Sequence, residues 1–180
     1  MHLLNQLAAG PFPESDGWAW LYRWFDRFAP ATGRLRRAIC RCYWPTRLER
    51  WRGGVVYRTL GVGAFGSVIP TGGIRIRRLT KSRMQPYTLV GSSLGAARAF
   101  YYKTCVFETL HLPFLAALVA LAIHRAAIGR LDLALENTAV NLLFNGYPIM
   151  HHRRTRLRIV QLLEGRAKRR RPVEGVGREE

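Results

Sequence analysis

The sequence has few cysteines and few acidic residues, and both shortages narrow the class of protein. Its three cysteines, Cys40, Cys42 and Cys105, form no spaced framework, so neither a disulfide-stapled scaffold nor a four-ligand zinc site is expected. We expect reduced thiols on the cytosolic side of a membrane. Only 11 acidic residues oppose 29 lysines and arginines, which leaves a net charge of +18. Such a charge requires an anionic neighbour, either nucleic acid or an anionic lipid leaflet.

The sequence also lacks the motifs of a signal peptide, a phosphate-binding loop and an RNA-binding domain. The first residues, Met1 to Gly17, have no basic region ahead of their apolar residues, so we expect no cleavable signal peptide. The glycines between Tyr57 and Gly73 lack the Gly-Lys-Ser/Thr ending of a phosphate-binding loop, and the default there is a surface loop. The arginine-rich stretch 34–58 carries no RNA-binding signature. We therefore expect no nucleic acid, and an anionic bilayer becomes the favoured partner.

Two apolar segments of nearly membrane-spanning length lie in the second half of the chain. The first runs from about Cys105 to Ile123 and the second from about Leu131 to Met150, with a short basic link between them. A span needs about 20 mostly apolar residues, whereas shorter segments fit a buried core helix equally well. Because asparagines and acidic residues interrupt the second segment, we predict a mainly α-helical, membrane-embedded hairpin of two spans whose polar residues face each other.

Around this hairpin we expect three regions. Residues 1–100 form a basic, aromatic-rich interfacial region that includes an amphipathic helix at 18–28, which either lies among the headgroups or packs on the rest of the chain. Residues 101–158 form the hairpin, and residues 159–180 a basic, partly disordered tail. Arginines crowd both flanks of the hairpin. The positive-inside rule then predicts a multi-pass protein of the cell membrane with both flanks in the cytoplasm.

Polar residues inside the apolar segments are candidates for function, because charge at membrane depth is costly. Glu108 and His111 share one helical face. The second segment carries a stripe of asparagines spaced by four: Asn137, Asn141 and Asn145. If the chain folds back near Ala127, Glu108 lies level with about Gly146 and His111 with about Leu143. The pair then meets the end of the stripe at Asn141 and Asn145, just beneath the cytoplasmic surface.

This set of side chains offers two interpretations. A carboxylate, an imidazole, amides and the nearby cations Arg153 and Arg156 could remove a proton from a hydroxyl and stabilise an oxyanion, as acyl transfer requires. The same groups could instead only bond the two helices together, as polar side chains do in membranes. No metal site is expected, because the adjacent His151 and His152 cannot both point to one place and His124 lies at the far end.

Three pieces of the chain carry a family resemblance when they are taken in order. They are the block from Tyr57, Tyr-x-x-Leu-Gly-Val-x-x-Phe with a Pro-x-Gly-Gly ending; the pair Glu108-Thr109; and Asn145-x-Tyr147-Pro148 followed by the arginines from Arg153 to Arg158. Together they resemble the glycosyl-4,4'-diaponeurosporenoate acyltransferase family of small bacterial membrane proteins of carotenoid-ester biosynthesis. This chain resembles a divergent member, with His152 where the family usually has glutamine.

The resemblance implies transfer of a fatty acyl group to a hydroxyl of a glycosylated or lipid-linked, carotenoid glycoside-like acceptor. The co-substrate would be an acyl donor such as acyl-CoA or acyl carrier protein, with no cofactor. Glu108 would act as general base or orient one, together with His111. Asn145 would be a further catalytic residue and, with Arg153, would bind the carbonyl oxygen or the donor's anionic carrier. Arg156 and Arg158 would bind the anionic headgroup or the carrier phosphate. Asn141 and Tyr147 complete the substrate-binding candidates. The alternative is a non-catalytic, membrane-anchored basic protein that binds anionic lipid or partner proteins.

Overall fold

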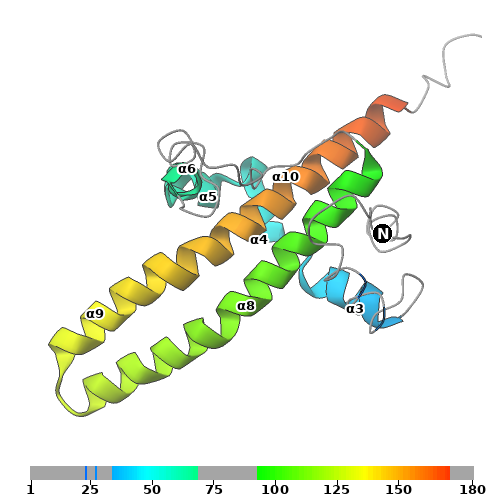
Figure 1. Ribbon diagram of the computed structural model, residues 1–180. Coiled ribbons are helices and arrows are strands. Elements are labelled where there is room, and N and C mark those ends of the chain that lie inside the picture. The colour runs from blue at the N-terminus through cyan, green and yellow to red at the C-terminus, as the bar shows by residue number, and fades with distance from the viewer. Residues whose placement is uncertain (1–22, 24–26, 28–33, 69–92, 171–180) are drawn as a thin grey trace, which may run out of the picture.

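The computed structural model describes residues 34–68 and 93–170, together with Arg23 and Arg27, and this part of the chain is mainly helical without a strand. Two long antiparallel rods form its axis (Figure 1). The first rod is α8 (Leu94–Ala127). The second joins α9 (Leu131–Asn141), the π-helical turn η2 (Leu142–Gly146) and α10 (Tyr147–Arg170) end to end.

Local signals in the sequence account for the limits of the first rod. The side chain of Ser93 accepts a hydrogen bond from the backbone N–H of Ala96 and caps α8. At the far end, Gly129 adopts a positive φ of 79°, which costs a glycine little and lets the chain reverse within three residues. Arg130 pairs with Asp132 at this exposed turn.

The second rod changes its pitch where proline interrupts the helical hydrogen bonds. Pro148 has no N–H to donate to the carbonyl one turn earlier, and its ring crowds that carbonyl. The wider turn η2 lies directly before Pro148 and ends at Gly146. Wide turns of this kind re-aim side chains within an otherwise regular helix. Here η2 carries Asn145 into the interface with α8.

The apolar core lies at the end of the rods that holds the chain's arginine-rich segments. Small residues of α8, Ala97 and Ala99, let α10 approach closely, and the cluster is completed by larger side chains from both helices: Phe100, Tyr101, Tyr102, Cys105, Ile159, Val160 and Leu163. Cys40 on α3 (Arg34–Cys42) closes it from the side, and its thiol hydrogen-bonds to the Tyr102 hydroxyl at 2.8 Å.

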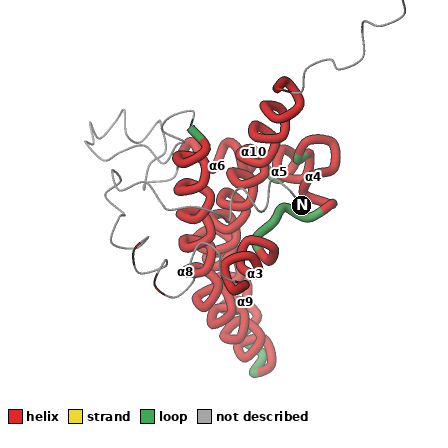
Figure 2. Tube along the Cα trace, turned by 90° about the vertical axis from the view of Figure 1, so that its right-hand side faces the viewer, coloured by secondary structure: helices red, strands yellow, loops and turns green. Residues whose placement is uncertain are grey.

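Short helices surround this basal end, as Figure 2 shows. They are α4 (Arg47–Arg50), the 3-10 turn η1 (Trp51–Gly53), α5 (Val55–Thr59) and α6 (Val62–Val68). Tyr57 and Val62 are buried against Leu157 of α10. Gly54 allows the approach, because a Cβ there would lie 2.8 Å from Leu157 and its φ is 86°. The surface loop expected from Tyr57 onward is therefore incorrect as far as Val68, where packing on α10 makes the segment helical.

The other end of the rods is apolar and uncovered. Phe114 and Ile123 on α8 and Leu135 and Phe144 on the second rod are all more than 60% exposed. Among the described residues one helix, α8, is long and apolar enough to cross a membrane. Little of its most apolar stretch is buried within the protein, which is unlike the core helix of a soluble protein.

The boundaries between regions that the sequence predicted, at positions 100 and 158, fall inside continuous helices. The first span, expected at 105–123, belongs to the longer α8, which runs through position 100. Helix α10 passes through position 158, so residues 159–170 of the expected tail are helical, and three of them join the core. The amphipathic helix expected at 18–28 and the tail beyond Arg170 lie outside the described residues, apart from Arg23 and Arg27.

Candidate active site

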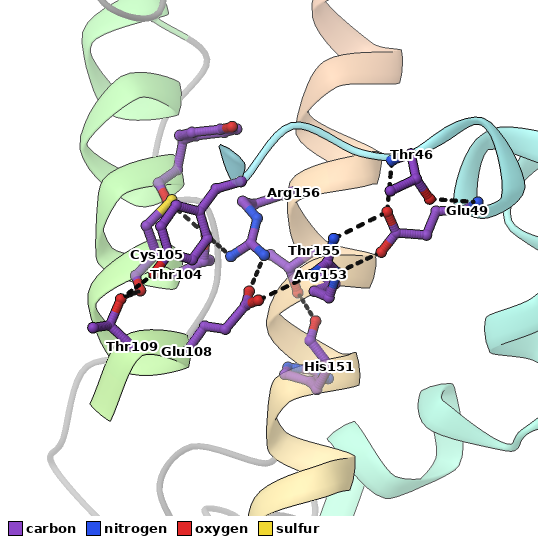
Figure 3. Close-up of polar contacts among 12 residues, drawn as sticks. Thr46, Glu49, Thr104, Cys105, Glu108, Thr109, His151, Arg153, Thr155 and Arg156 are labelled. Carbon is purple, nitrogen blue, oxygen red and sulfur yellow. Dashed lines mark hydrogen bonds and ion pairs between the residues drawn. The ribbon is translucent and has the colours of Figure 1, made fainter. Parts of the chain in front are cut away.

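A buried carboxylate lies between the rods at the boundary of their basal and apolar parts. Glu108 of α8 is 2% exposed and forms ion pairs with two arginines of α10 (Figure 3). Arg153 donates from Nη1 to Glu108 Oε1 at 3.2 Å, and Arg156 donates from Nη2 to Oε2. Because both oxygens of the carboxylate bind guanidiniums, this geometry makes Glu108 an anchor for the arginines.

A second carboxylate reaches the same arginines from the short helices. Glu49 of α4 accepts from Arg153 Nε at 2.6 Å and from the hydroxyl of Tyr57. Its other oxygen accepts the backbone N–H of Thr46, whose side chain accepts in return from Glu49, so a capping box aims the carboxylate inward. Burial alone would raise the pKa of Glu49, but the hydrogen bonds from Arg153, Tyr57 and Thr46 outweigh it and lower the pKa to about 2.

Arg156 is the most deeply buried member of this ion-pair network, at 1% exposure. Besides its ion pair with Glu108, it donates from Nη1 to Thr104 Oγ1 at 3.3 Å and lies 5.3 Å from the ring centroid of Tyr43. Two carboxylates therefore balance two guanidiniums. The network joins α4, α8 and α10, and within the described part of the chain the buried Nε group of Arg156 has no hydrogen-bond partner.

A second polar group begins one helical turn further toward the turn between the rods. His111 Nδ1 lies 3.2 Å from Asn145 Oδ1. Asn145 donates from Nδ2 to Asn141 Oδ1 at 2.9 Å, and Asn141 donates from Nδ2 to the carbonyl of Leu115 at 3.0 Å. We call these three side chains the polar ladder. It links α8 to η2 and α9 within apolar surroundings.

The direction of every bond in the polar ladder follows from its last acceptor. The Leu115 carbonyl can only accept, so Asn141 must present its NH2 group there and its oxygen to Asn145. Asn145 in turn must present its oxygen to His111. The His111 ring therefore donates from Nδ1, and in its neutral form the lone pair lies on Nε2. A neutral imidazole held in this tautomer is the arrangement that general-base catalysis requires.

His152 borders both groups. Its ring stacks on Phe107, with centroids 5.7 Å apart and 13° between the planes, and lies 6.1 Å from the ring of His111. Burial, aided by the positive charges nearby, lowers the pKa of His152 to about 3. The ring is therefore neutral at physiological pH and adds an aromatic wall beside His111.

The structure brings together most of the residues predicted from the sequence. His111 meets Asn145 as expected. Glu108 does not reach the stripe, because side chains on antiparallel helices lean toward their own N-termini. Glu108 leans toward the basal end and the arginines lean toward the far turn, so they meet each other beyond the level of Gly146.

Two predicted residues lie apart from this centre. The hydroxyl of Tyr147 donates to the Leu60 carbonyl at 3.1 Å, and its ring packs on Phe65, which gives it a structural contact with α6. Arg158 is exposed on α10. The third asparagine of the stripe, Asn137, keeps a buried NH2 group for which no hydrogen-bond acceptor occurs within the described part of the chain.

Sequence reasoning named Tyr57 and His152 only as parts of the family-like motifs, and it did not name Glu49 or Thr104. The motif Thr46-x-x-Glu49 does signal a capping box, but a cap alone does not indicate that the carboxylate also reaches an arginine far along the chain. In residues 34–68 and 93–170, no group of three histidine, cysteine or acidic side chains could hold a metal ion.

Comparison with known proteins assigns the chain to a family. No curated protein and no solved structure matches it. The family described as glycosyl-4,4'-diaponeurosporenoate acyltransferase matches residues 36–165. This range contains both carboxylates, the paired arginines and the whole polar ladder, so it covers the site and most of the chain. The chain therefore belongs to the glycosyl-4,4'-diaponeurosporenoate acyltransferase family.

Proposed function

We propose that the protein is an integral membrane acyltransferase that transfers a fatty acyl group to a hydroxyl of a glycosylated or lipid-linked acceptor. The family name implies acyltransferase activity in carotenoid biosynthesis. The observation that carries the proposal is the polar ladder, because it holds His111 with a free Nε2 lone pair between two helices whose outer surfaces are apolar.

Both rods cross the bilayer in this proposal. Their far halves expose large apolar side chains on the second rod as well as on α8, which is how a lipid-facing surface looks. His111 lies about 26 Å along α8 from the far turn, at 1.5 Å per residue, and the hydrocarbon core is about 30 Å thick. The site would then lie just beneath the headgroups of the cytoplasmic leaflet, with both basic flanks in the cytoplasm.

The polar ladder suits direct transfer from a thioester donor, either acyl-CoA or acyl carrier protein. The acceptor hydroxyl oxygen attacks the thioester carbonyl carbon while its proton passes to His111 Nε2. The carbon–sulfur bond then breaks, the thiolate leaves with the electron pair, and the His111 imidazolium returns the proton to it.

The neighbouring residues position the reacting groups in this scheme. Asn145 orients the His111 ring, and Asn141 orients Asn145. Of the two arginines that bind Glu108, Arg153 has the more accessible side chain, 27% exposed against 1% for Arg156. We assign Arg153 to the negative charge that develops on the carbonyl oxygen, a role in which the oxyanion competes with the ion pairs of Arg153 to Glu49 and Glu108. Glu108 holds the arginines in place.

The experiment compares two histidines of the same helix. The purified full chain in nanodiscs receives an acyl-CoA and glycosyl-4,4'-diaponeurosporenoate, and ester formation is followed by mass spectrometry. We expect His111→Gln to lower kcat by about 10²–10⁴-fold, the usual contribution of a general base. His124→Gln, at an exposed position near the far turn, should retain activity. Equal turnover by both variants would remove His111 from the mechanism. No turnover by the unsubstituted chain would favour the non-catalytic, lipid-binding alternative.

A further inference from the structure

At the basal end of the rods, carboxylates neutralise a defined set of arginines. Glu49 pairs with Arg153, Glu108 pairs with Arg153 and Arg156, and Glu164 pairs with Arg50 at 2.7 Å. The other acidic residues that the structure describes, Asp132 and Glu136, lie on α9 near the far turn. Asp132 pairs with Arg130 there, so these two carboxylates lie away from the place where α5 and α6 meet α10.

Three arginines outside this set gather where α5 and α6 meet α10. Arg154 lies against α6 so closely that a Cβ on Gly63 would be 2.7 Å from its Nη1. Arg158 follows one turn later on the same face of α10, and Arg58 extends from α5, where its Nη2 donates to the Arg52 carbonyl at 3.1 Å. No ion pair involves Arg58, Arg154 or Arg158 within residues 34–68 and 93–170.

The three guanidiniums also act on one another. Partial burial, and next the positive charges of Arg158 and Arg58, lower the pKa of Arg154. Because like charges at short range repel, an anion placed among them would relieve that repulsion and accept several charge-assisted hydrogen bonds. Guanidinium groups match phosphate oxygens particularly well, since two parallel N–H groups can bind one phosphate.

We infer that Arg58, Arg154 and Arg158 bind the phosphate groups of the acyl donor's carrier. The inference rests on the proposed function, and it moves phosphate binding from the buried Arg156, which Glu108 neutralises, to an exposed cluster. Only Arg158 of this cluster was among the phosphate-binding candidates from the sequence.

Position along the rods puts the cluster within reach of a soluble carrier, and the vesicle measurement below separates this source of phosphate from a lipid headgroup. Arg154 and Arg158 lie about 34 and 40 Å along the second rod from Leu131. The hydrocarbon core is about 30 Å thick and one headgroup layer adds about 5–8 Å. The backbone of Arg154 therefore lies in the headgroup layer and that of Arg158 at its outer limit, where a donor that arrives from the cytosol can reach both residues. A flexible pantetheine arm would then extend from the cluster toward His111.

The test measures binding without turnover. The full chain in nanodiscs of pure phosphatidylcholine is titrated with adenosine 3',5'-bisphosphate by calorimetry at low salt. Because hydrogen bonds to charged groups are strong, we expect Arg154→Gln and Arg158→Gln each to weaken binding by about tenfold or more. Gly63→Ala should weaken it as well, since its new methyl group displaces the Arg154 guanidinium while every charge remains. Arg47→Gln, at an exposed position on α4, is the matched control.

A second measurement, with lipid vesicles, distinguishes the phosphate of a soluble carrier from the phosphate of lipid headgroups. Flotation with vesicles of phosphatidylglycerol and phosphatidylcholine is measured for the same variants. Weaker binding of the bisphosphate with unchanged flotation supports the inference. Equal affinities for all variants, or a loss of flotation alone, would overturn it. If the chain transfers acyl groups but does not bind the bisphosphate, this inference alone is wrong. If the chain binds the bisphosphate and the His111→Gln variant is fully active, only the proposed catalytic role of His111 is wrong.

Discussion

Arg156 shows how strongly a single buried charge depends on its partner. Its guanidinium is almost inaccessible to water and is neutralised by Glu108. Removing one partner of a buried ion pair costs about 3–5 kcal/mol, because the other charge is left uncompensated. We expect Glu108→Gln to lower the melting temperature of the detergent-solubilised chain by roughly 6–20 °C, at about 2–4 °C per kcal/mol for a chain of this size.

The double variant is the control for this expectation. Glu108→Gln combined with Arg156→Gln removes both charges, so it should destabilise the fold by clearly less than the sum of the two single variants. Strictly additive losses would mean that the two side chains do not stabilise each other. The same measurement separates a structural role of Glu108 from a role as general base, because a mere base could be replaced by glutamine with little change in melting temperature.

Glu49 should give the fold a defined dependence on pH. Its pKa in the folded chain lies at about 2, below the ordinary value of 4.5, so the ionised form stabilises the fold. That contribution is fully present above about pH 5 and is lost as the pH falls from about 4.5 toward 2. We expect Glu49→Gln to melt at a lower temperature than the unsubstituted chain at pH 7, with the difference shrinking between pH 5 and pH 2. A difference that stays constant over this range would contradict the assignment.

At the scale of elements, the two rods were predictable because their signals are local. The two apolar runs and the short basic link between them lie next to the structure they specify. The helices α5 and α6 were not predictable in this way. Their glycines disfavour a helix in isolation, and only the burial of Tyr57 and Val62 against Leu157, far along the chain, offsets that preference.

In the candidate site, too, contacts that follow from local spacing were predictable from the sequence and contacts between distant segments were not. Helical spacing alone placed His111 beside Asn145, since both residues belong to regular elements joined by a short turn. The partner of Glu108 depended instead on the direction in which long side chains lean. Glu49 meets Arg153 across a separation of 104 residues, and no local pattern encodes such a contact. Its capping motif could indicate only the start of α4.

At the scale of the whole molecule, the structure separates a basal part held by ion pairs from an apolar pair of rods. The short helices join the rods only at the basal end (Figure 1), and the exposed apolar side chains dominate the other end. A water-soluble protein would leave this surface in contact with solvent at considerable cost. A bilayer removes that cost if both rods enter it, because the polar ladder then satisfies its own hydrogen bonds away from lipid.

Cysteine labelling in whole cells tests this arrangement. In a Cys42→Ser background, one cysteine is introduced at the far turn, Ile128→Cys, and another near the basal end of α10, Ala167→Cys; both positions are exposed. If both rods cross, a membrane-impermeant maleimide should label position 128 in intact cells and position 167 only after permeabilisation. Labelling of both positions in intact cells would indicate a single crossing by α8. That outcome would place Arg154 and Arg158 outside the cell, away from any cytosolic acyl donor.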